Sequence, residues 1–223
     1  MFVVERFAAW AEDYRKVPIA PEVLHHAKRA VIDLYAALLP GAVVAPATLL
    51  ESALKEELDR GKAMLALGRS ATVRAAALIN GTAAHTVEVD DIFRDGIYHP
   101  GAPTIPAALA MAQAHDASGE RFLRAVIVGY EIATRIGAAM GRAHYKYWHN
   151  TGTIGVFGAC AAARPACSGL DIESMRKDCC RPAENVVTVA SACAKRFASR
   201  PSSSAAAAQA PKQPMVPVLC QYR

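Results

Sequence analysis

The chain has 223 residues, of which 53% are hydrophobic and 20% charged, a balance typical of a globular protein with a substantial core. Its formal charge of +5 does not come from a basic stripe with interleaved aromatic residues, which argues against nucleic-acid binding. We see no secretory signal and no apolar run of the roughly 20 residues that a membrane span needs. We therefore expect a cytoplasmic protein without a membrane segment.

Hydrophobic periodicity predicts a largely helical chain. In chain order, helices are expected at 21–39, 47–60, 71–91, 103–115, 120–140 and 151–163. Pro21 suits a first helical position, and Ser118 is a good N-cap for the helix at 120–140. The segment 61–70 is interpreted as a connection that could carry a short extended piece, and 92–102 as a loop. Because strand patterns are sparse, the predicted fold class is all-α.

The composition of the chain changes near residue 164. All seven histidines precede residue 150, whereas all six cysteines lie from Cys160 onward. The cysteine spacing fits neither a disulfide framework nor paired zinc-binding motifs. The end of the chain is rich in Pro, Ser and Ala and lacks a helical period, which suggests a reading-frame slip in a GC-rich coding sequence. We therefore predict a helical domain at 1–164 and a degraded tail, partly helical and partly disordered, at 165–223.

Three phrases between residues 80 and 163 concentrate histidines and acids. They read NGTAAHTVEVDD, IYHPGAPTIPAALA and HYKYWHNTGTIGVFGACAAA. Burying charged and imidazole groups costs free energy, so their place in Ala-rich helical sequence needs a functional reason. In this order and spacing the phrases resemble the MmgE/PrpD family, which includes 2-methylcitrate dehydratase and cis-aconitate decarboxylase. The resemblance implies an all-helical domain of the MmgE/PrpD type, here incomplete and without the family's C-terminal α+β lid domain.

The resemblance implies catalytic roles for four residues. His99 and His149 align with two active-site histidines of the family, and a neutral imidazole can move protons at cellular pH. Glu88 stands where the family phrase D-F-D-D-T has its first acid. Asp91 is assigned to the same site. Asp90 and Asp91 lie at the end of the predicted helix 71–91, where adjacent acids point in different directions, so they cannot both face one site. Where the family has Thr, this chain has Ile92, and this difference leaves the substrate open.

Three further residues are assigned to substrate binding. Thr151 and Gly152 follow His149 at the start of a helix, where unpaired N–H groups favour a carboxylate. The glycines of that helix are interpreted as close-packing positions, because no phosphate-loop lysine follows them. Lys195 lies near the position of a substrate-binding lysine of the family. His85 is interpreted as a structural or supporting histidine.

The function that the resemblance implies is that of a lyase acting on a small polycarboxylate, similar to 2-methylcitrate dehydratase. The reaction would proceed by proton transfer to and from histidine side chains, with no metal and no other cofactor. Dehydration, decarboxylation and epimerisation all stay open. A homodimer is also implied, and we expect weak or absent activity from a chain without the lid domain.

Two alternatives remain at this point. One is a metal-dependent all-helical hydrolase built on His115, Asp116 and the acids near His85. The other is a non-enzymatic, truncated product that exposes apolar surface and associates.

Overall fold

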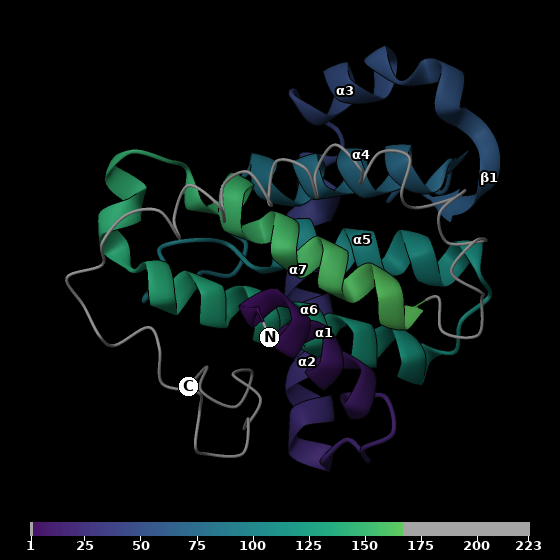
Figure 1. Cartoon of the computed structure of the whole chain (residues 1–223). Helices are drawn as coiled ribbons and strands as arrows, with labels where there is room; N and C mark the ends of the chain where they lie inside the picture. The colour runs from purple at the N-terminus through teal and green to yellow at the C-terminus, as the bar shows by residue number, and fades with distance from the viewer. Residues whose placement is uncertain (1, 167–223) are drawn as a thin grey trace. The chain divides into compact units, whose positions relative to one another are not determined.

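The computed structural model describes residues 2–166 (Figure 1). Within this range the backbone forms seven α-helices and one small antiparallel sheet, which confirms the all-α class. None of these helices is both long enough and apolar enough to cross a membrane. The predicted tail and Lys195 lie outside the described residues, so the proposed division of the chain stays a prediction.

The six predicted helices occur in the predicted order, and they are preceded by α1, which was not predicted. The α-helices are α1 (Val3–Tyr14), α2 (Pro21–Gly41), α3 (Ala47–Ala53), α4 (Val73–Thr86), α5 (Gly101–Ala114), α6 (Gly119–Met140) and α7 (Asn150–Ala166). Two short 3-10 helices are η1 (Lys55–Glu57) and η2 (Arg142–Lys146), and the strands are β1 (Leu58–Met64) and β2 (Ser70–Ala71). The sheet pairs Met64 with Ser70, which places the expected extended piece just before α4.

Two helix predictions were too long at their C-terminal ends. The helix expected at 47–60 ends at Ala53, and the chain continues through η1 into β1. The helix expected at 71–91 ends at Thr86. Glu88 lies two residues beyond the end of α4 and has a positive φ of 54°, a conformation that cannot continue a right-handed helix. Asp59, with φ of 58°, lies inside β1 and likewise cannot be helical.

The helix starts agree with their local sequence. Pro21 lies in the first turn of α2, where its missing N–H costs no hydrogen bond. The Ser118 hydroxyl accepts a hydrogen bond from the backbone N–H of Arg121 and caps α6, as predicted. Thr72 caps α4 in the same way, by accepting from the N–H of Ala75.

Helices α5, α6 and α7 meet at a crossing made of small residues. A Cβ added to Gly129 of α6 would lie 2.4 Å from Cγ2 of Thr104 on α5 and 2.7 Å from the carbonyl oxygen of Gly158 on α7. A Cβ added to Gly158 would lie 2.5 Å from the Thr104 hydroxyl oxygen. These contacts confirm close packing at Gly158, and Gly155 packs in the same way against Pro103, but Gly152 is exposed and is not a close-packing position. They also fix the N-terminal end of α7, which carries part of the predicted site.

Candidate active site

Three of the predicted site residues lie in the loop at 87–100, which joins α4 to α5. Asp91 anchors this loop, because its Oδ1 accepts the backbone N–H of Gly101 at 2.9 Å and its Oδ2 accepts the Tyr130 hydroxyl at 2.8 Å. The first contact reaches the start of α5 and the second reaches α6. A backbone bridge between Phe93 and Tyr98 folds the loop back on itself.

The start of α7 is bound to the same loop. Asn150 is fully buried, donates from its side-chain amide to the carbonyl oxygen of Gly96, and has its Oδ1 in hydrogen-bond contact with Nδ1 of His144. The hydroxyl oxygen of Thr151 accepts the backbone N–H of His99 at 3.1 Å. Residues about fifty positions apart are therefore held together by polar contacts of buried or half-buried groups.

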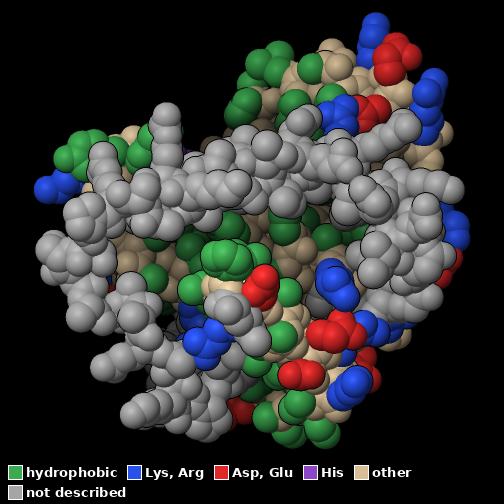
Figure 2. Space-filling view, in the orientation of Figure 1, with side chains coloured by type: hydrophobic (Ala, Val, Ile, Leu, Met, Phe, Trp, Pro, Cys, Tyr) green, Lys and Arg blue, Asp and Glu red, His purple; other side chains and the backbone are tan. Residues whose placement is uncertain are grey.

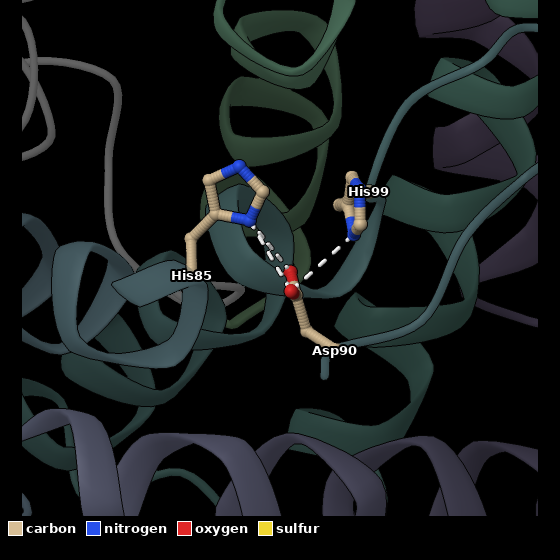
Figure 3. A group of neighbouring side chains, drawn as sticks. All are labelled: His85, Asp90 and His99. Carbon is tan, nitrogen blue, oxygen red and sulfur yellow. Dashed lines mark hydrogen bonds and ion pairs between the residues drawn. The ribbon is translucent and has the colours of Figure 1, made fainter. Parts of the chain in front are cut away.

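A buried carboxylate, that of Asp90, lies at the centre of the site (Figure 3). His85, from the last turn of α4, has its Nδ1 3.0 Å from Oδ2 of Asp90 and 3.2 Å from Oδ1. His99 has its Nδ1 3.3 Å from Oδ1 of Asp90. Figure 3 shows both rings turned toward this single carboxylate.

A third imidazole lies beside these two. The ring centroid of His85 is 4.7 Å from that of His99 and 6.0 Å from that of His149. His149 immediately precedes α7, and its ring is exposed and 6.1 Å from the ring of Tyr145. Both predicted catalytic histidines are thus neighbours of His85.

The remaining predicted residues occupy different surroundings. The side chain of Glu88 is 70% exposed, and its Oε1 lies 3.7 Å from Nε2 of His85. Both oxygens of Asp91 bond to α5 and α6 rather than to an imidazole. Thr151 is buried, whereas Gly152 is exposed, and a Cβ added to Gly152 would lie 3.7 Å from Nδ1 of His149.

From the sequence, no role in the site was assigned to Asp90, and His85 was interpreted only as a structural or supporting histidine. Asp90 was judged as part of a helix that in fact ends at Thr86. Beyond that end, neighbouring residues face opposite ways, so Asp90 turns to the histidines while Asp91 turns to Tyr130. The available signal was an acid five residues after a histidine at a helix end, which indicates a local pair only once the helix end is known.

Asp91 also borders a surface cavity on the side of α2. The cavity has a volume of about 500 Å³, and its lining includes His26, Arg29, Asp33 and Ile92. Burial raises the pKa of Asp91 to about 6, although hydrogen bonds from Tyr130 and Gly101 work against this, and the negative charges of Asp90 and Asp33 raise it further. Burial and the charge of Asp90 likewise raise the pKa of Asp33.

Among the described residues, His85, Asp90 and His99 are the group that could reach a single metal ion. Their donor atoms lie within 4.8 Å of one another, and two imidazoles with a carboxylate form a familiar metal-ligand set. His115 and Asp116, proposed from the sequence for a hydrolase, are not part of this group. Asp116 instead pairs with the exposed Lys62. The expectation that the site binds no metal stays a prediction.

Comparison with known proteins places these residues in a family. A sequence profile of the MmgE/PrpD N-terminal domain matches residues 5–210. The cis-aconitate decarboxylase-like protein oryM of Aspergillus oryzae (strain ATCC 42149 / RIB 40) is 28% identical over 171 residues. That similarity covers 72% of this chain but 36% of the relative, so the chain spans about a third of the relative's length. The profile match extends over most of the sequence, and the chain therefore belongs to the MmgE/PrpD family.

Proposed function

We propose that the chain carries the histidine part of a lyase site for a small polycarboxylate, with chemistry like that of 2-methylcitrate dehydratase. The observation that carries this proposal is the pair of imidazoles, His85 and His99, that contact the buried Asp90 carboxylate, with the ring of His149 beside His85 next to the N-terminus of α7. Family membership supports a lyase, and the name of the fungal relative supports a substrate of the tricarboxylate class.

The proposed chemistry is proton transfer next to a carboxylate. His99 accepts a proton from the substrate carbon, and the freed electron pair forms the carbon–carbon double bond. The hydroxyl group then leaves as water, taking its second proton from His149. In a decarboxylation the electron pair would come instead from the broken carbon–carboxylate bond, and the carbon would take up the proton. Both outcomes need one imidazole as base or acid within reach of the substrate and no redox cofactor.

Substrate carboxylates are proposed to bind at the start of α7. The first backbone N–H groups of a helix have no partner within the helix and carry a partial positive charge. Thr151 and Gly152 lie in this first turn, next to His149. Lys195 is proposed to supply a fixed cation. Glu88, whose side chain is exposed, is proposed to act on the site through its contact with His85.

A homodimer in the cytoplasm is the remaining part of the proposal. Several large apolar side chains on α2 and α3 are exposed, among them Ile32, Leu39 and Leu49. Figure 2 shows hydrophobic side chains gathered over the segment that carries α3. Such surface supports association of the chain. Sedimentation of the purified protein tests this part, because a purely monomeric species at tens of micromolar would contradict it.

The experiment that tests the reaction uses the 223-residue chain with 2-methylcitrate and with cis-aconitate in deuterated water. We expect slow turnover or slow deuterium uptake into the substrate carbon, followed by NMR. His99→Asn and His149→Asn should each lower the rate by roughly 10²–10⁴-fold, the usual contribution of a general acid or base. His115→Asn, a histidine outside the cluster, is the matched control and should keep the wild-type rate. If the chain shows no turnover and no deuterium exchange with either acid, the proposal is refuted.

A further inference from the structure

We propose that Asp90 is a positioning residue, which accepts the Nδ1–H of both His85 and His99 and so leaves Nε2 of His99 as the nitrogen that takes the substrate proton. This inference rests on the proposed function for its catalytic meaning, but the tautomer that it specifies belongs to the free protein. The imidazole has two distinct nitrogens, and the partner of one decides which of them carries the proton.

The first argument is the burial of the Asp90 carboxylate. Its side chain is only 1% exposed, and a buried carboxylate needs donors to offset the loss of water. Among the residues that the structure describes, the side-chain contacts of its oxygens are those with Nδ1 of His85 and Nδ1 of His99. A ring nitrogen next to a carboxylate is stabilised as a donor, so each of the two should carry a hydrogen.

The second argument is the environment of His99. Its Nδ1 is buried and has no aligned hydrogen-bond partner among the described residues, although Oδ1 of Asp90 lies 3.3 Å away. The distance suits a hydrogen bond, and a small rotation of the ring would correct the angle. Because the backbone N–H of His99 is already held by Thr151, the ring is the part that can adjust.

The third argument is that one carboxylate holds both rings. The His85 ring is a neighbour of both the His99 ring and the His149 ring, and Asp90 contacts it at Nδ1. A change at Asp90 should therefore move two imidazoles at once. A metal ion bound by the same three side chains would require the opposite arrangement, with a bare Nδ1 on each ring and the hydrogen on Nε2.

The test is the nitrogen NMR spectrum of the histidine rings in the 15N-labelled 223-residue chain near neutral pH. His85→Asn and His99→Asn assign the two signals. We expect a protonated Nδ1 on both rings in the wild-type protein and in Asp95→Asn, a matched change at an exposed acid of the same loop. Asp90→Asn replaces one acceptor oxygen by an amide donor, so at least one ring should change to the Nε2–H form. Asp90→Glu keeps both acceptors and should retain Nδ1–H on His99.

Kinetics adds a second measurement. Asp90→Asn should lower kcat by roughly 10²–10⁴-fold with little change in KM. The groups proposed to bind the substrate at the start of α7 are unchanged, whereas Nε2 of His99 no longer has the required protonation state. A buried Asp that orients a catalytic histidine in serine proteases shows a loss of about 10⁴-fold on the same change. Asp95→Asn should leave both parameters unchanged.

Two results would overturn the inference. One is an Nε2–H tautomer of His99 in the wild-type protein. The other is an Asp90→Asn spectrum with the same tautomers as Asp95→Asn. A wild-type protein without turnover would refute the proposed function and would leave the tautomer result standing, so the two failures can be told apart.

Discussion

The loop at 87–100 and the crossing of α5, α6 and α7 position the same site by different physical means. The loop is held by a few directional contacts of buried polar groups, chiefly those of Asp90, Asp91 and Asn150. The crossing is held by shape, because Gly129 and Gly158 leave no space for a Cβ. A polar contact that is lost leaves its partner unsatisfied in the interior, whereas a misfit in the crossing can be shared among neighbouring helices.

This difference has a functional consequence. In the loop, each polar contact sets the direction of one side chain, so a substitution there should change the geometry of the site. In the crossing, a substitution should change mainly the free energy of unfolding, and the site only through a shift of α7. The following four predictions test that contrast, from the largest expected effect to the smallest.

Asn150→Ala should give the largest loss of stability. It removes the partner of the Gly96 carbonyl and of the His144 ring, and each buried group left unsatisfied costs about 1–3 kcal/mol. We expect the free energy of unfolding in urea to fall by roughly 2–5 kcal/mol. Thr153→Ala, in the same first turns of α7, removes only contacts to the carbonyl oxygens of His149 and Asn150 in the turn before it and should cost under about 1 kcal/mol. Equal losses in the two variants would contradict the tethering of the loop through Asn150.

Asp91→Asn should change how stability depends on pH. Because burial raises the pKa of Asp91 from 3.8 to about 6, the folded state holds this proton more tightly than the unfolded chain. Its contribution to stability is present below pH 3.8 and is lost as the pH rises through about 6. Relative to Asp91→Asn, the wild-type protein should therefore lose up to about 3 kcal/mol between pH 4 and pH 7.

Urea unfolding at several pH values measures this difference, and Asp95→Asn serves as the exposed control from the same loop. Parallel stability curves for the wild-type protein and Asp91→Asn would show that Asp91 is not a buried, proton-binding anchor.

Gly129→Ala tests the crossing itself. The added methyl group would overlap Thr104 and Gly158, and overpacking of this kind costs about 1–3 kcal/mol. Gly119→Ala is the matched control, because it lies on the same helix and its Cβ would meet nothing within 4 Å. We expect the control to be neutral or slightly stabilising. If thermal unfolding shows the same effect for both glycines, the close approach of the three helices is wrong.

Glu88→Gln should have the smallest effect. The side chain is 70% exposed, and its contact with His85 at 3.7 Å is that of a surface pair. We expect a change of under about 0.5 kcal/mol in the free energy of unfolding and a change of a few-fold in kcat/KM. A loss as large as that of Asp90→Asn would instead make Glu88 a central acid of the site.

The sequence predicted the regular parts of the fold better than the site. The helix at 120–140 and its Ser118 cap were predictable because both the apolar period and the cap are local signals. The end of α4 was not, because Ala-rich sequence has no residue that stops a helix there. The chain leaves the helix through the positive φ of Glu88 and the contact of His85 with Asp90, which only the folded loop provides.

The same reasoning applies to the site residues. His99 and His149 were selected by resemblance, and their common neighbour His85 became visible only when α4, the loop and α7 were placed in space. The pairing of Asp90 with two imidazoles depends on side chains that point alternately to opposite sides along a non-helical segment. Because the acids were predicted to lie on a helix, this pairing was not predicted.

The central claim is that His85, His99 and His149 form one binding site for an organic acid. The most direct measurement is a titration of the 15N-histidine-labelled chain with cis-aconitate. His25, His26 and His115 serve as internal controls in the same spectrum. The account predicts that ring signals of His85, His99 and His149 shift together along one binding curve while those of the controls stay in place. Shifts confined to His26, which lines the cavity beside Asp91, or no saturable shift in the three clustered rings would contradict it.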